Sequence, residues 1–584
     1  MRTPDQNPQP ISVPHARTFS WRRLISPDCP SCIGTLALLL LVGLVFHSVV
    51  GFQFLRWDDD ITATRNPLMT RPWSWSLLAN LFDAQQALRF KPVHWIVCKV
   101  VHSIWGMNPA AWHCIGLTFH ALATVLVFIV GRRLFRLTMP ENTGLRIDVV
   151  TWLAAVLWAL HPLRVETVAW VTASTYPMAT ALLLASFAAY LHSITSTKKI
   201  HWLVGSWILA MSAYGTYPIT LTYGAFLILF DVCIVKTAPS KLWILTDSRV
   251  RSWWLKHLAF SLPAIIALTA TIWTRFLFPQ FFPPAPNLEA LTLIGRVYHA
   301  AITAGFLLVR PLGPWDFTSN RYYIDESVLH APTITLYAMV PLLIGLSAYL
   351  LRRQLHHGSA AIAGWLVLSV PCLGLTENFC WPADRYSYLV DVIWSLMIAA
   401  VILKLLPTAR FILGKMLLLS TAAVTVTLIA LCSLITSVTL PTWKDSDRFF
   451  TDMSCRDDFF VYWTQAANIY KLWAWHLHES GFPKAASFRM SQGCELYDIE
   501  VMKALHTRDL HSAVAIVDAR ADRGFPMPLI LRRERAAWNL ELGKLDAAHR
   551  ELTNVAQLLS WDTRTRSLLA DPRFVERRPL NDPP

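Results

Sequence analysis

Three consecutive aspartates, Asp58, Asp59 and Asp60, follow the first long apolar run of the chain. Carboxylates repel one another and are costly to desolvate, so we expect them just outside a bilayer. One of them could accept the proton of an attacking hydroxyl as a general base. In an extended backbone Asp58 and Asp60 would share a face, a spacing that also suits Mg²⁺ or Mn²⁺. The alternative is a solvated charge run that fixes the end of the first span.

Charged residues recur beside two later apolar runs, in His161-Pro-Leu-Arg164-Val-Glu166 and Asp384-Arg385-Tyr386. Arginine binds phosphate in a bidentate manner. A base for an acceptor hydroxyl and a cation for a phosphate leaving group together suit attack on a phosphate-linked sugar. The alternative is local ion pairing at helix ends, between Arg164 and Glu166 and between Asp384 and Arg385.

His113 and His120 are seven residues apart and therefore share a helical face. Metal-binding histidines on a helix are usually four residues apart, so polar packing against another helix is the better interpretation. The sequence has no P-loop, no Ser-His-Asp set, no HExxH and no Gly-rich dinucleotide turn. A soluble nucleotide donor or peptidase chemistry therefore has no motif to support it.

The composition is typical of a polytopic membrane protein. Of 584 residues, 54% are hydrophobic and 15% are charged, whereas soluble domains carry about 25% charged residues. The net charge is +14, but the basic residues cluster in short segments between apolar runs, as the positive-inside rule requires. Nucleic-acid binding is therefore not expected.

Eleven apolar stretches are long enough to be candidate spans. They are residues 33–53, 111–131, 148–163, 172–194, 201–217, 218–236, 257–275, 334–351, 360–377, 388–405 and 411–438. With a cytosolic tail over residues 1–32, every cytosolic segment is basic and the charged motifs all lie on the exoplasmic face. We expect 291–310 to be an interfacial or re-entrant helix, because counting it as a span would invert the later loops.

The domain organisation follows from these spans. We expect an all-α transmembrane domain over residues 33–440, with a large first exoplasmic loop at 54–110. Residues 441–584 are polar and helical in pattern. Within them the segment around 533–558 combines an aromatic helix, a Leu-Gly turn and an Ala-Ala helix, which is typical of a tetratricopeptide repeat. Weaker units could occupy 462–489 and 498–520, so we expect a short exoplasmic repeat domain.

Taken together, the motifs resemble those of a known family, bacterial relatives of the transmembrane-and-tetratricopeptide-repeat proteins in the GT-C glycosyltransferase superfamily. The matching stretches occur in the family's order. They are Trp57–Pro67, Phe90–Trp95, Gly106–His113 with His120, Leu160–Trp170, Ala383–Leu389 and Pro441–Phe450.

The resemblance implies a GT-C-like fold and an activity. Such enzymes transfer a sugar from a polyprenyl-phosphate donor to an exoplasmic acceptor, with an acid of the first exoplasmic loop as base. Members with assigned activity are protein O-mannosyltransferases. The resemblance therefore implies Asp58 and Asp59, then Asp60, as catalytic residues. It implies donor-phosphate binding by Arg385, together with Arg164. The other residues that we expect to bind donor or substrate are Lys91, Arg89, His113, Glu166, Asp384 and Tyr386, of which Lys91 and Arg89 could compensate for charges that the family pattern has and this chain lacks.

The expected partners are a polyprenyl-phosphate-linked sugar, a protein or glycan acceptor, the lipid bilayer and a protein bound to the repeats. Many GT-C mannosyltransferases need no metal, so no cofactor is certain, although a divalent cation at the Asp triplet stays open. The expected location is a bacterial inner membrane, with the C-terminal domain periplasmic.

Two departures from the family pattern stand out. An acidic-basic cluster is common shortly after the HPLRVE-like motif, where this chain has residues 171–177, VTASTYP. A Lys-Pro is common at the head of the sixth span, where this chain has Tyr217-Pro218. Two charged groups expected near the donor are thus missing. The alternative function is a non-catalytic membrane scaffold whose repeats recruit partners; a transporter is a further rival, disfavoured because no internal repeat of spans is obvious.

Overall fold

The described residues of this computed structural model form helices and contain no strand, which confirms the all-α prediction. They are 30–82, 90–239, 243–244, 246–277, 293–313, 332–375, 383–405, 412–446, 448–450, 473, 476–477, 509–522, 529–558 and 563–575. The chain divides into two compact units. The first contains the residues up to Phe52 together with Ile61–Pro441, and the second contains Gln53–Asp60 together with Thr442–Pro584.

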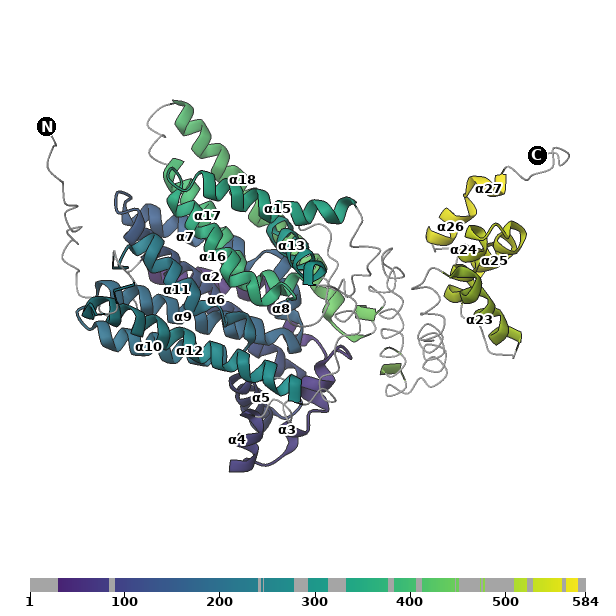
Figure 1. Cartoon of the computed structure of the whole chain (residues 1–584), viewed down its shortest axis with the longest axis horizontal. Helices are drawn as coiled ribbons and strands as arrows, with labels where there is room; N and C mark the ends of the chain where they lie inside the picture. The colour runs from purple at the N-terminus through teal and green to yellow at the C-terminus, as the bar shows by residue number, and fades with distance from the viewer. Residues whose placement is uncertain are drawn as a thin grey trace. The chain divides into compact units, whose positions relative to one another are not determined.

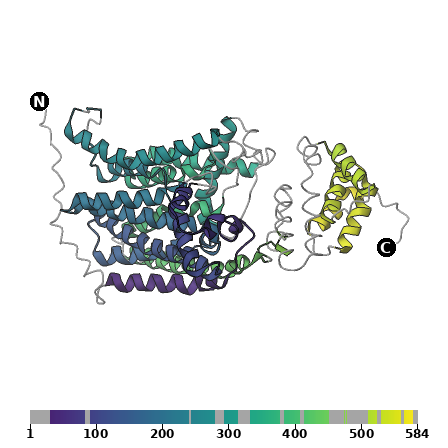
Figure 2. The same cartoon turned by 90° about the horizontal axis from the view of Figure 1, so that it is seen from below.

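The first unit is a bundle of apolar helices (Figures 1 and 2). Its first half comprises α2 (Pro30–Phe46), η1 (His47–Gly51), η2 (Asp60–Thr64, which starts in the second unit), α3 (Pro67–Thr70), α4 (Trp75–Phe82), α5 (Pro92–Trp105), α6 (Pro109–Thr138), α7 (Gly144–Ala159), η3 (Pro162–Arg164), α8 (Val165–Ala169), η4 (Val171–Ser174), α9 (Thr175–Thr195) and α10 (Lys199–Tyr214). Its second half comprises η5 (Pro218–Thr220), α11 (Tyr223–Phe230), η6 (Asp231–Val235), α12 (Ser248–Leu277), α13 (Leu293–Val309), η7 (Arg310–Leu312), α15 (Pro332–Leu350), α16 (His356–Ser369), η8 (Val370–Cys372), η9 (Asp384–Tyr386), α17 (Ser387–Leu405) and α18 (Ile412–Thr439).

Six of the described helices are long and apolar enough to cross a membrane. They are Cys32–Gly51, Pro109–Thr138, Val171–Thr195, Pro218–Val235, Asp384–Leu405 and Leu419–Trp443. A seventh span results if the bent pair of α7 with Pro162–Ala169 is counted as one. The described part of the chain thus contains six or seven such helices, fewer than the expected eleven. The remaining four predicted stretches are also helical, as α10, α12, α15 and α16.

The bend between α7 and α8 lies at the end of the predicted span 148–163 and makes the pair a broken helix. The two parts meet at 59°, where His161 caps the next turn and Pro162 occupies its first position. A break leaves backbone carbonyls without their helical partners. His120 of α6 donates from Nε2 to the Ala159 carbonyl at 3.2 Å, and Thr436 of α18 donates to the Leu160 carbonyl at 2.9 Å. The loop is thereby held between two helices distant in sequence.

Helix α13 covers the predicted interfacial stretch and is 17 residues long. It packs tightly on α15, because a Cβ at Gly305 would lie 1.7 Å from the Tyr337 carbonyl oxygen. Only glycine permits this approach of two backbones. The helix is followed directly by Arg310 in η7, so the close packing fixes where that side chain lies.

The second unit joins residues 53–60 to the segment that follows α18. The Gln53 N–H donates to the Lys444 carbonyl at 2.8 Å, and the Arg56 N–H donates to Ser446 Oγ at 3.0 Å. The Trp57 ring lies 5.6 Å from that of Phe449. The described elements of this unit outside that segment are η11 (Leu440–Trp443, which starts in the first unit), α23 (Leu510–Asp522), α24 (Leu529–Glu541), α25 (Leu545–Leu558), α26 (Thr563–Leu569) and α27 (Pro572–Val575).

Helices α24 and α25 form a hairpin in the predicted repeat segment. Gly543 has a φ of +75° in the turn, a left-handed conformation that glycine adopts without a steric cost. Arg535 bridges the helices through Glu551 at 3.1 Å. Of the two weaker predicted units, 462–489 lies almost entirely outside the described residues, and 498–520 overlaps α23 only in part.

Candidate functional site

Arg164 is a fully buried charge of the first unit and lies at the α7–α8 break. Its Nη2 donates to Asp391 Oδ2 in α17 and to Ser387 Oγ at 3.3 Å. The guanidinium centre lies 5.5 Å from the Trp158 ring centroid and 5.3 Å from that of Tyr388. Its Nε and Nη1, and Oδ1 of Asp391, are buried with no hydrogen-bond partner among the described residues. The pair therefore retains donor and acceptor capacity for a further polar group.

Glu166 and Arg385 form the second buried pair. Arg385 donates from Nη1 to one carboxylate oxygen of Glu166, and its backbone N–H donates to the other at 3.0 Å. The guanidinium also lies 5.6 Å from the Trp170 ring centroid and 5.0 Å from that of Tyr386. Because both carboxylate oxygens are engaged, Glu166 fixes the position of Arg385.

Asp384 forms a bidentate pair with Arg310, a residue that the motif search did not select. Arg310 donates from Nε to Oδ1 at 2.8 Å and from Nη2 to Oδ2 at 3.2 Å. In the next residue, the Pro311 carbonyl lies 3.1 Å from Nε2 of His161. The Leu163 N–H donates to Nδ1 of that histidine at 3.3 Å, which assigns the ring proton to Nε2.

The three pairs carry three positive and three negative charges, all buried. They connect the α7–α8 break, η7 and the start of α17. Sequence reasoning placed Arg164, Glu166, Asp384, Arg385 and Tyr386 on one face, and the structure brings them together. The alternative of an Arg164–Glu166 pair is wrong, because the partners come from other elements. Because the positive and negative charges of the three pairs cancel, an anionic ligand bound here would make the site net negative.

The two departures from the family pattern meet beside this array. Tyr176 and Tyr217 have their hydroxyls 3.3 Å apart and their ring centroids 4.8 Å apart. The Tyr176 ring is also 6.4 Å from that of Tyr386. A neutral tyrosine pair therefore occupies the positions where the resemblance led us to expect charged groups. Phenols donate and accept hydrogen bonds without changing the charge of the site.

Lys91 lies at the start of α5, close to the turn that carries Tyr217. The N–H of Val93 donates to the Gly215 carbonyl at 2.9 Å. The Lys91 ammonium is buried and lies 4.1 Å from the Trp95 ring centroid, a cation–π distance. Lys91 is thus a buried cation whose helix is hydrogen-bonded to the turn before Tyr217.

Arg89 and His113 are the two other predicted binding residues, and only His113 lies among the described residues. Arg89 lies outside the described residues. His113 is buried in α6, with its ring 6.1 Å from that of Phe52. This ring contact fits the packing role that the spacing of His113 and His120 suggested.

The Asp triplet does not adopt the extended backbone that we assumed. Asp58 has a φ of +65°, Asp59 follows the turn, and Asp60 starts a π-helix. The alternation that would place Asp58 and Asp60 on one face is therefore wrong. The left-handed region is uncommon for residues with a Cβ, although Asp and Asn tolerate it best. Strained positions of this kind cluster at functional sites.

The three carboxylates differ in environment. Asp58 is exposed, whereas Asp59 and Asp60 are buried. The Leu55 N–H donates to Asp59 Oδ2 at 2.8 Å, so Asp59 closes the turn that precedes it. Within the described residues, no three His, Cys, Asp or Glu side chains are grouped closely enough to hold a metal ion.

Two residues of the array were missed at the sequence level, Arg310 and Asp391. Asp391 gave a usable signal, because it is a lone carboxylate inside an apolar span and such groups are functional by default. Arg310 follows an apolar stretch directly, but its sequence position alone gives no indication that it pairs with Asp384.

Two curated relatives match part of the chain. Protein O-mannosyl-transferase TMTC1 of Mus musculus is 27% identical over 146 residues, which is 23% of this chain and 14% of that protein. Protein O-mannosyl-transferase TMTC1 of Homo sapiens is also 27% identical over 146 residues, or 23% of this chain and 15% of that protein. The chain therefore spans about one seventh of the length of these relatives. No protein-family model and no solved structure matches it.

Proposed function

We propose that the chain is a membrane glycosyltransferase of the GT-C type. Its donor is a polyprenyl phosphate that carries a mannose-like sugar. The buried array at Arg164, Glu166 and Arg385 carries the proposal, because it is built from the motifs that resemble this family. The partial similarity to protein O-mannosyl-transferases supports the same class. The acceptor is a hydroxyl on the exoplasmic side of a bacterial inner membrane, with protein Ser or Thr the first candidate.

Asp58 is the proposed general base. Asp59 accepts a backbone hydrogen bond and is buried, whereas Asp58 is exposed at the turn. As the acceptor oxygen attacks the anomeric carbon, its proton passes to the Asp58 carboxylate. The bond from the anomeric carbon to the phosphate oxygen breaks, and its electron pair leaves with the polyprenyl phosphate. In-line attack inverts the anomeric centre.

Arg385 is the proposed ligand of the departing phosphate. Glu166 holds its backbone and side chain, so the guanidinium is positioned before the donor arrives, as electrostatic catalysis requires. The donor must add negative charge to balanced pairs, and Lys91 is the proposed source of compensating charge. Tyr176 and Tyr217 supply hydroxyl donors in place of the missing charges, so we propose that they alter donor preference.

The test measures sugar transfer from labelled polyprenyl-phosphate sugars in membranes with matched amounts of each variant. Asp58→Asn and Arg385→Gln are compared with Asp247→Asn and Arg249→Gln, which change exposed residues at the start of α12. We expect loss of transfer, by about a hundredfold or more, in the first two only, since general bases contribute about 10²–10⁴. Parallel assays with EDTA decide whether a divalent cation at the Asp triplet takes part.

If wild-type membranes transfer sugar from none of these donors, the proposal fails and the scaffold function becomes the better one. The neutral Tyr176–Tyr217 pair is the observation that favours that alternative. A protein bound to the α24–α25 hairpin would support it. If Asp58→Asn keeps full sugar transfer and Asp59→Asn loses it, Asp59 is the general base instead.

A further inference from the structure

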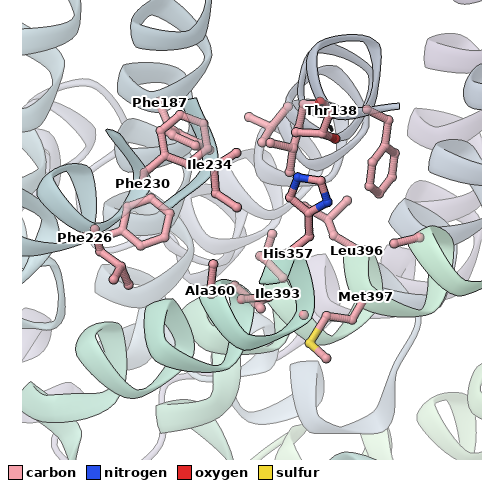
Figure 3. A pocket seen from close by; sticks show the side chains of 18 of the residues that line it. Thr138, Phe187, Phe226, Phe230, Ile234, His357, Ala360, Ile393, Leu396 and Met397 are labelled. Carbon is pink, nitrogen blue, oxygen red and sulfur yellow. Dashed lines mark hydrogen bonds between the residues drawn. The ribbon is translucent and has the colours of Figure 1, made fainter. Parts of the chain in front are cut away.

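A large apolar cavity lies in the first unit, and its lining includes none of the charged residues of the array. Its volume is about 400 Å³, within the range of ligand pockets. Helices α6, α9, α11, α16 and α17 line it, and the walls are almost entirely aliphatic and aromatic. Figure 3 shows Phe187, Phe230 and Leu396 around this space. Its chemistry suits a hydrocarbon and not a sugar.

The length of the cavity suits an extended hydrocarbon chain. Its lining runs along α17 from Leu389 to Lys404, which are fifteen residues apart and thus about 22 Å along a helix. The cavity is therefore long enough for an extended hydrocarbon chain.

One end of the cavity is basic. The lining there includes Lys404 at the end of α17 and His357 at the start of α16, whose ring points into the cavity in Figure 3. Burial is the largest cause that lowers the pKa of His357. His356, Lys404 and Lys236 lower this pKa further, and Glu141 raises it. Cationic groups therefore outnumber carboxylates around this mouth. The helix ends that meet here belong to the loops whose basic residues predicted the cytosolic face.

We propose that this cavity binds one chain of an anionic phospholipid, with its headgroup at Lys404 and Lys236. The occupant is not the proposed sugar donor. Arg385, the proposed phosphate ligand of that donor, is nineteen residues from Lys404 and so about 28 Å from the basic end of the cavity, and it is four residues from Leu389 at the other end. The inference rests on the cavity and its basic mouth alone and stands whether or not the chain transfers sugar.

The experiment quantifies phospholipids that remain bound to the full chain purified in mild detergent, by mass spectrometry. Lys404→Gln removes one cation at the mouth, and Lys198→Gln removes an exposed one in another basic loop. A lysine near an anionic lipid contributes about 1 kcal/mol of binding free energy. Lys404→Gln should therefore weaken binding of phosphatidylglycerol, supplied in vesicles, about fivefold. Lys198→Gln should leave it unchanged.

A second pair of variants tests the cavity itself. Ala361→Phe fills part of it, and Leu346→Phe changes a residue that is 55% exposed on α15. Displacing two or more methylene groups, at about 0.8 kcal/mol each, should lower affinity about tenfold or more. Phosphatidylglycerol should raise the melting temperature of wild type and Leu346→Phe but not of Ala361→Phe, which also reveals whether that variant folds.

Three results would overturn the proposal. They are retention of the same anionic lipid by Ala361→Phe, equal binding of neutral phosphatidylcholine by wild type, and recovery of a polyprenyl phosphate in place of a phospholipid. The last result would assign the cavity to the donor's tail and leave the glycosyltransferase proposal intact.

Discussion

Glu166 and Arg385 offer a test of whether the buried array is coupled as its geometry indicates. Glu166→Gln keeps the shape of the side chain but removes its charge, which leaves Arg385 buried without a counterion. Removing one partner of a buried pair costs about 3–5 kcal/mol. The two bonds to Arg385, one from Nη1 and one from the backbone N–H, are of the charge-assisted kind, each worth about 1.5–3 kcal/mol. We therefore expect Glu166→Gln to lower the free energy of unfolding by about 4 kcal/mol.

The double variant Glu166→Gln/Arg385→Gln removes both charges. It no longer leaves a buried ion without a partner, so its cost should fall short of the sum of the single variants by about 2 kcal/mol. The free energies come from unfolding in mixed micelles with increasing SDS, followed by far-ultraviolet circular dichroism. Arg136→Gln is the matched control. Arg136 pairs with Asp148 at 3.2 Å but its side chain is 52% exposed, so its loss should cost no more than about 1 kcal/mol.

The coupling of Glu166 to Arg385 is refuted if Glu166→Gln costs as little free energy of unfolding as Arg136→Gln. It is also refuted if the single costs add to that of the double variant within about 0.5 kcal/mol, since that result describes independent residues. Either outcome would remove Glu166 as the group that positions Arg385.

Three further perturbations have defined outcomes. Gly305→Ala places a Cβ 1.7 Å from a backbone oxygen of α15 and should lower the melting temperature, with a cost of about 1–3 kcal/mol; Gly345→Ala, which meets nothing within 4 Å, should not. Asp58→Asn should unfold at the wild-type temperature because Asn tolerates a positive φ, whereas Asp58→Ala should cost about 1–2 kcal/mol; equal melting of the two would contradict the strained turn. Burial raises the pKa of Cys98 to about 12, so peptide mapping should find it unmodified by N-ethylmaleimide at about pH 8 until the protein unfolds. Burial, then Lys91, hold the pKa of His94 well below 6.5, so the unfolded state binds more protons below that pH; stability should fall as pH drops from about 7 to 5, and less so in His94→Gln.

The sequence predicts the gathering of the charged motifs but not their pairing. Each motif follows or precedes an apolar run, and the alternation of basic loops assigns them to one face. The partners are determined by tertiary packing. Residues one or two apart on a helix do not face each other, so Arg164 finds Asp391 and Glu166 finds Arg385. Those partners are 227 and 219 residues away, and a single sequence gives no indication of such distances.

The backbone of the Asp triplet shows a different limit. Alternation along a strand is a regular pattern, but Asp58 lies in a left-handed turn that no periodicity predicts. Its conformation depends on Leu55, whose N–H bonds Asp59, and on the segment after α18 that holds Arg56. The cavity was likewise unpredicted, because apolar residues that line it have the same composition as those that fill a core.

The broken helix also has a consequence for biogenesis. Arg164 and Glu166 enter the membrane long before their partners exist, since Arg385 is 219 residues further along the chain. At translation rates of about 5–20 residues per second, this interval lasts about 10–45 s. The Leu160 carbonyl lacks its hydrogen-bond donor for longer still, because Thr436 is 276 residues further along the chain. During that time the unfinished break needs water, lipid headgroups or the insertion machinery as temporary partners. The array is thus completed only when α17 has been made, and the bond to the Leu160 carbonyl only when α18 follows. A chain truncated before α17 presents unpaired charges.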